Sequence, residues 1–116
     1  MRYELLIYGD ESGMAALSAQ EHEAITAPYA AFVEAATKAN VLRGGERLQP
    51  TSSATVVRVR DGKTLTTDGP YAETKEQLGG YFIVECAHLD EALEWAARIP
   101  GAAQGAVEVR PIWEMA

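Results

Sequence analysis

Short extended runs of apolar residues alternate along this chain with two stretches of helical periodicity. The first run, Arg2–Tyr8 (RYELLIY), is rich in aromatic and aliphatic side chains and stops at Gly9–Asp10, which predicts a strand followed by a turn. Asp61–Gly62 favours a tight hairpin turn, because both positions tolerate positive φ. Further strands are predicted over Val41–Gln49, Ala54–Arg60, Thr64–Thr67, Gly80–Cys86 and Ala106–Ile112. Gly44–Gly45 indicates a bulge or a close backbone approach in the second strand.

Two helices are predicted between these strands. Ser18–Glu21 has the spacing of a capping box, so a long helix should begin at Ser18 and end near Ala39–Asn40. Pro28 lacks an N–H group, which predicts a kink or a break into two helices. A shorter helix is predicted over Asp90–Arg98. The inner stripes are expected to be Ile25, Tyr29, Phe32, Val33 and Ala36 in the first helix, and Leu89, Ala92, Leu93, Ala96 and Ile99 in the second.

The order of the elements predicts an α+β domain spanning residues 1–116. Strand, helix, strand, hairpin, long connection, strand, helix and strand follow each other, which is the ferredoxin-like pattern of an antiparallel sheet with both helices on one face. The long connection, Asp68–Gly80, is polar and rich in glycine, with one helical turn expected near Glu73–Gln77. The other face of the sheet should then be apolar and open, which predicts a homodimer formed by two such faces around a two-fold axis.

Composition and charge narrow the range of partners. Of 116 residues, 47% are hydrophobic and 23% charged, as in ordinary globular proteins. The net charge of -7 disfavours nucleic acids and anionic membranes. The cluster of Arg43, Arg47, Arg58 and Arg60 either forms a local basic patch or faces water along strands. The single Cys86 cannot form an internal disulfide, and no secretory signal or membrane-spanning run is evident. We therefore expect a cytoplasmic protein in which Cys86 is a buried strand residue.

Several motifs resemble the YCII-related, DGPF-motif family along nearly the whole chain. The most specific lies in Thr67–Tyr81 (TDGPYAETKEQLGGY), where Asp68–Tyr71 reads DGPY, with Tyr in place of the family's Phe. The other matching stretches are Tyr3–Asp10 (YELLIYGD), Gly44–Gln49 (GGERLQ), Thr55–Lys63 (TVVRVRDGK) and Leu89–Arg98 (LDEALEWAAR).

The resemblance implies a dimeric α/β-barrel fold with a cleft at or near the dimer interface. Some relatives in the wider family resemble enzymes that use a His-Asp pair, with the His on the first helix, and that position aligns with Pro28–Tyr29 here. Members with the DGPF motif are often encoded near alternative sigma factors, which implies a regulatory or sensory role.

Polar residues near the predicted cleft are the candidates for chemistry. Asp68 begins a Gly-Pro turn, so it either caps backbone N–H groups or projects into the cleft as a general base. His22 either points at the cleft or is a solvated or packing residue of the first helix. The predicted ligand-binding set is Tyr8, Asp10, Asp68, Pro70, Tyr71 and Lys75, which combines phenols, carboxylates and a cation. His88 is expected to be a helix cap or surface residue, and Trp95 and Trp113 to be packing or interface anchors.

Three functions are consistent with these residues. The first is a small-molecule-binding homodimer that holds a small polar organic ligand under the Asp68–Gly80 loop. The second is a lyase, isomerase or dehydrochlorinase in which Asp68 and either His22 or Tyr71 transfer protons. The third is an interaction module linked to sigma-factor regulation. No metal ligand spacing is evident, and no cofactor is expected.

Overall fold

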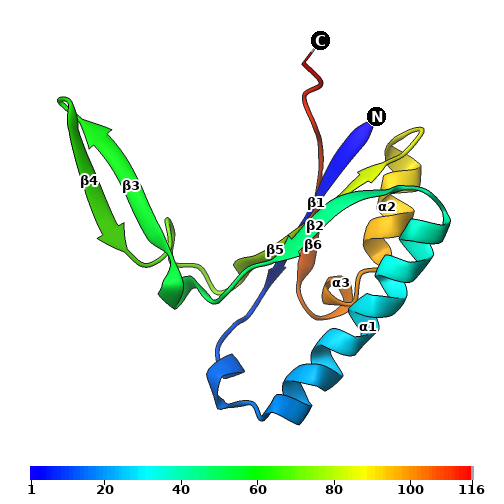
Figure 1. Ribbon diagram of the computed structural model, residues 1–116, viewed down its shortest axis with the longest axis horizontal. Coiled ribbons are helices and arrows are strands. Elements are labelled where there is room, and N and C mark those ends of the chain that lie inside the picture. Colours follow the sequence, from blue (N-terminus) through cyan, green and yellow to red (C-terminus); the bar gives the residue numbers. More distant parts are fainter. Residues whose placement is uncertain (116) are drawn as a thin grey trace.

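Three helices lie against one face of a four-stranded antiparallel sheet. The structure is a computed structural model that describes residues 1–115. The sheet has the order β2-β5-β1-β6, and its strands are β1 (Arg2–Gly9), β2 (Leu42–Arg47), β5 (Gln77–Glu85) and β6 (Ala106–Pro111). Helix α1 (Ala19–Lys38) connects β1 to β2, while α2 (Leu89–Ala97) and α3 (Gly101–Gln104) connect β5 to β6. Figure 1 shows all three helices on the same side of the sheet. The predicted α+β, ferredoxin-like arrangement is confirmed.

Strands β3 (Thr55–Arg60) and β4 (Lys63–Asp68) form a hairpin outside this sheet. We call this hairpin, residues 55–68, the arm. Asp61 and Gly62 have φ angles of 50° and 74°, as expected for the predicted tight turn. Figure 1 shows the arm extending away from the sheet on the side opposite the helices. Every arm side chain except Val56 is exposed, so the hairpin is not part of the core.

The core lies between the helices and the sheet. Leu5 of β1 and Val84 of β5 are fully buried, and the ring centroid of Phe32 in α1 lies 4.8 Å from that of Phe82. The other buried apolar residues are Tyr3, Ala36, Val41, Cys86, Ala92, Ala96 and Ile99. The predicted burial of Cys86 is therefore confirmed.

Helix α1 begins and ends as its sequence predicts but is not broken. Ser18 and Glu21 form the reciprocal capping box, and Asn40 follows the helix with a φ of 59°. The helix continues through Pro28, so the predicted alternative of two separate helices is wrong. Pro28 cannot donate to the carbonyl of Ala24, but Ala24 is exposed, so water can hydrate that carbonyl.

Three other details differ from the sequence predictions. Ile25 and Val33 of α1 are 39% and 37% exposed, and Leu89 and Leu93 of α2 are 46% and 45% exposed, so both buried stripes are narrower than expected. The helical turn predicted near Glu73–Gln77 does not form, because Gln77 already pairs with Gly9 as the first residue of β5. The 3-10 turns η1 (Met14–Ala16) and η2 (Thr51–Ser53), and helix α3, were not predicted.

The paired glycines of β2 provide a test of the packing. A Cβ atom at Gly45 would collide with the Phe82 ring and lie 2.8 Å from the carbonyl oxygen of Tyr81, whereas one at Gly44 would meet nothing within 4 Å. We expect Gly45→Ala to lower the free energy of unfolding by about 1–3 kcal/mol, as overpacking does. Gly44→Ala, the matched control, should change it by less than about 0.5 kcal/mol. Urea unfolding measures both, and equal losses would contradict the close approach at Gly45.

Candidate functional site

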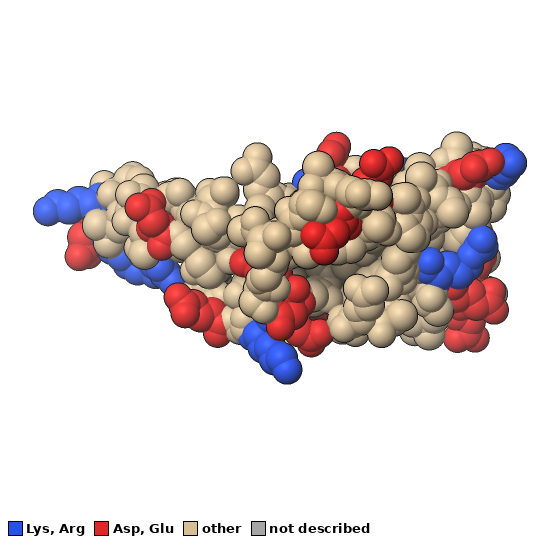
Figure 2. Space-filling view, turned by 90° about the horizontal axis from the view of Figure 1, so that it is seen from below, with Lys and Arg blue, Asp and Glu red and all other residues tan. Residues whose placement is uncertain are grey.

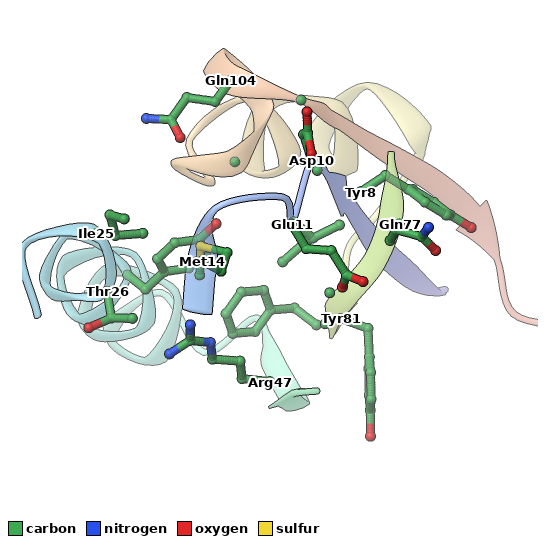
Figure 3. Close-up of a pocket in the computed structure, with 18 of the residues that line it drawn as sticks. Tyr8, Asp10, Glu11, Met14, Ile25, Thr26, Arg47, Gln77, Tyr81 and Gln104 are labelled. Atoms are coloured by element: carbon green, nitrogen blue, oxygen red, sulfur yellow. The ribbon is translucent and has the colours of Figure 1, made fainter. Parts of the chain in front are cut away.

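A cavity of about 570 Å³ opens at the end of the sheet where β1 leaves it. This volume lies within the range of roughly 300–1,000 Å³ that is typical of small-molecule sites. Residues of β1, the following loop, α1, β2, β5 and α3 line it, as Figure 3 shows. The pairing of β1 with β5 shifts register between Ile7 and Tyr8, so the sheet is irregular at the cavity.

The wall of the cavity is largely apolar. Ile7 of β1, Tyr29 of α1 and Phe82 of β5 are partly buried and also pack against the core. Met14 and Ile25 line the cavity from the loop and from α1. The exposure of Ile25, which the helical periodicity did not predict, is therefore explained by its position at the cavity.

Tyr8 lies at the cavity, but its hydroxyl is directed away from Ile25 and Thr26 (Figure 3). The hydroxyl donates to Glu108 Oε1 at 3.3 Å, and Glu108 also accepts from Arg110 Nε at 3.1 Å. Burial and then the Glu108 charge raise the pKa of Tyr8, while the hydrogen bond from Arg110 lowers the pKa of Glu108. Tyr8 is therefore a neutral phenol whose hydroxyl already donates a hydrogen bond to Glu108 of the neighbouring strand β6.

Two carboxylates stabilise the loop after β1. Asp10 Oδ1 accepts from the backbone N–H of Ser12 at 2.9 Å, and the hydrogen bonds from Ser12 lower the pKa of Asp10. Both oxygens of Glu11 accept from the backbone N–H of Thr51 at 3.2 Å, and the Thr51 hydroxyl also donates to Glu11. Both carboxylates line the cavity, and Glu11 holds the loop against η2 while Asp10 stabilises the loop locally.

Arg47 is the cation that lines the cavity. Within residues 1–115, no carboxylate lies within 4.0 Å of its guanidinium nitrogens. Figure 3 shows its side chain extending toward the α1 side of the cavity, where Thr26 lies, with Gln77 and Gln104 at other edges. In the sequence, Arg47 belongs to an arginine cluster that was expected either to form a local basic patch or to face water. The sequence feature that could have indicated its cavity position is the pair Gly44–Gly45, which ends two residues before Arg47 and leaves the strand without side chains there.

The structure does not bring all the predicted site residues together. Tyr8 and Asp10 line the cavity, while Lys75 lies with Asp10 at a second, adjacent hollow. His22 is half-buried on α1, and neither it nor Asp68 lines either space.

The DGPY motif also lies away from the cavity. Asp68 ends β4, and Pro70 and Tyr71 follow it outside both spaces. Tyr71 is 81% exposed, and the Arg58 guanidinium lies 5.6 Å from its ring centroid. Of the predicted Asp68–Gly80 roof, the cavity is lined by Gln77, Gly79 and Gly80, which belong to β5.

The remaining candidates lie in the second half of the chain. His88 accepts a hydrogen bond from the backbone N–H of Glu91 and caps α2, as predicted. Trp95 packs on the core, with its ring edge-on to Phe32, whereas Trp113 is 89% exposed.

Two further properties of the described residues bear on the site. Among residues 1–115, no group of three His, Cys, Asp or Glu side chains is arranged to hold a metal ion. In the same part of the chain, no helix has the length and apolar character needed to cross a membrane.

The environment of Tyr8 predicts a pH effect. The raised pKa means that folding favours the neutral phenol, so this contribution to stability is present below the ordinary value of 10.0 and is lost as the pH rises through the folded value. Titration of phenolate absorbance should reveal a group with a raised midpoint that is missing in Tyr8→Phe. Glu108→Gln should lower its midpoint, because the carboxylate charge is removed. An unchanged midpoint would argue against this interaction.

Comparisons with known proteins agree with the motifs. A relative from Rhizobium meliloti (strain 1021), described as an uncharacterised protein, is 41% identical over 114 residues, which cover 97% of this chain and 92% of the relative. The family description of the YCII-related domain matches residues 1–116. The resemblance expected from the motifs is thereby confirmed, and the chain belongs to the YCII-related domain family.

Proposed function

We propose that this chain is a cytoplasmic, homodimeric small-molecule-binding protein whose ligand occupies the cavity at the end of β1. The observation that carries the proposal is Arg47, a cation at the edge of a largely apolar cavity of about 570 Å³. Its guanidinium has no carboxylate partner in the described chain, so its charge is available to a ligand. A planar guanidinium binds carboxylates and phosphates through paired hydrogen bonds.

The rest of the cavity defines the other parts of the ligand. Ile7, Tyr29 and Phe82 offer contacts to an apolar or aromatic body. Figure 3 shows Asp10 and Glu11 lining the cavity away from α1. Their negative charge favours a ligand with a donor or cationic group there. The best-fitting ligand is therefore a small organic acid with an aromatic or apolar body, and an aromatic amino acid has all three parts.

The dimer is proposed from the uncovered side of the sheet. Residues whose side chains alternate with the core residues of β1, β5 and β6 form what we call the open face: Arg2, Glu4, Leu6, Tyr8, Tyr81, Ile83, Glu85, Glu108 and Arg110. Leu6, Tyr81 and Ile83 lie together at its centre, although the face is more charged than the sequence suggested. An apolar centre with a polar rim is typical of protein interfaces, so a second copy can cover it.

Ligand binding is tested by thermal unfolding with aromatic carboxylic acids and aromatic amino acids. A compound present at 100 times its Kd should stabilise the native state by about 2.7 kcal/mol and raise the Tm. Arg47→Gln should abolish this shift. Arg43→Gln is the matched control on the same strand, because Arg43 bonds backbone carbonyls outside the cavity and should leave the shift intact. Equal shifts in wild type and Arg47→Gln would contradict the assigned role.

The dimer is tested separately at the open face. Ile83→Glu places a carboxylate at the proposed interface, where desolvation disfavours association, so sedimentation velocity should detect monomers. Val33→Glu is the control, because Val33 is 37% exposed on α1 and lies outside the open face. A dimer that persists in Ile83→Glu would overturn pairing through this face, whatever the ligand result.

A further inference from the structure

The chain leaves an unusually large surface in water, and the arm contributes to it because all of its side chains except Val56 are exposed. The chain exposes 8129 Å², whereas a monomer of 12.5 kDa is expected to expose about 6,200 Å². Its radius of gyration is 16.2 Å, against about 13 Å for a compact chain of this length. The excess of roughly 1,900 Å² on one chain is larger than the roughly 800 Å² that each partner buries in a standard protein interface. This surface is therefore sufficient for a stable contact with a partner.

The two faces of the arm differ in chemistry. The cross-strand pairs Val57–Thr66 and Val59–Thr64 place uncharged β-branched side chains on one face. Val57 and Val59 are 60% and 58% exposed. The pairs Arg58–Leu65 and Arg60–Lys63 place three cations on the other face. Within the described residues, none of these cations forms an ion pair.

The charge of the arm is opposite to that of the rest of the chain. The arm holds three of the 10 cations and two of the 17 anions, so the remainder holds 7 cations against 15 anions. Figure 2 shows Lys and Arg side chains together with some acidic ones at the arm end, and mainly Asp and Glu over the middle of the molecule. On the open face, the carboxylate of Glu4 has no ion-pair partner among residues 1–115. The acidic body of an identical chain therefore complements the arm.

We propose that the arm docks on a second copy of this chain, with its cations facing the partner's acidic body and its valines covered by the contact. The inference rests on the proposed dimer and adds a second contact to it. The arm projects on the side of the sheet that carries the open face, so two copies paired through that face each direct an arm toward the other (Figure 1). A reciprocal contact, in which each arm docks on the other copy, accounts for a hairpin with exposed valines that extends from a small domain.

The test is charge reversal on the arm. The double variant R60E/K63E removes one cross-strand cation pair, leaves Arg58 over Tyr71, and lowers the net charge by four. The control K38E/R43E lowers the net charge by the same amount at exposed sites on α1 and β2. We expect sedimentation velocity to show that R60E/K63E raises the dimer Kd by about tenfold or more, while K38E/R43E stays close to wild type. Equal effects of the two variants would overturn the arm contact.

A shortened arm provides the second variant. Replacing residues 57–66 by Asn-Gly retains the Val56–Thr67 pair and closes it with a new tight turn, while the exposed valines and the three cations are removed. Because the arm lies outside the core, circular dichroism should show an unchanged fold, and the dimer Kd should rise as in R60E/K63E. An unchanged Kd would overturn the proposal.

Three further outcomes distinguish the arm contact from pairing through the open face alone and from polyanion binding. Wild type that stays monomeric at all concentrations would overturn both the dimer and the arm contact. Ile83→Glu monomers beside a fully dimeric R60E/K63E would leave the dimer standing and overturn the arm contact alone. Arm-dependent retention on heparin with unchanged self-association would assign the arm to a polyanion and would also overturn it.

Discussion

The alternation of side chains along β1 is the constraint on which the other features depend. Tyr3 and Leu5 point into the core, whereas Glu4 and Leu6 point to the open face. Because β1 lies between β5 and β6, this alternation sets the faces of both neighbours through the register. A slip of one residue would expose the core side chains and bury the charged ones. The end of the same strand carries the cavity residues, where the pairing with β5 shifts register between Ile7 and Tyr8.

The candidate site depends on how the loop after β1 is held. Glu11 bonds Thr51, which is distant in sequence, and Asp10 bonds the neighbouring Ser12. These bonds use acceptor capacity of the two carboxylates, while Arg47 on β2 has no acidic partner in residues 1–115. A cation with free hydrogen-bonding capacity beside apolar walls is a combination suited to an organic anion. This is why the proposed function rests on Arg47 rather than on the more numerous acidic groups.

The DGPY motif shows why a specific motif and a site need not coincide. Asp68 ends the arm, and Tyr71 lies under Arg58 with 81% of its surface exposed. In this subunit the motif connects the arm to β5 and contributes nothing to the cavity wall. Its aromatic ring instead adds to the exposed surface of the arm region. That placement puts the most distinctive stretch of the sequence beside the arm and outside the cavity.

Local patterns in the sequence were sufficient for the strands, the capping box at Ser18, the turn at Asp61–Gly62 and the bulged glycines of β2, because each depends on neighbouring residues. The ferredoxin-like pattern also followed from the succession of elements, but the separation of the β3–β4 hairpin from the main sheet did not. The continuity of α1 through Pro28, the exposure of Leu89 and Leu93, and the cavity position of Arg47 depended on tertiary structure. Each is set by the surroundings of a residue in space: the exposure of Ala24, the exposure of one side of α2, and the shared cavity of β2 and the loop after β1. Periodicity along a chain carries no information about those neighbours, so only the folded arrangement decided them.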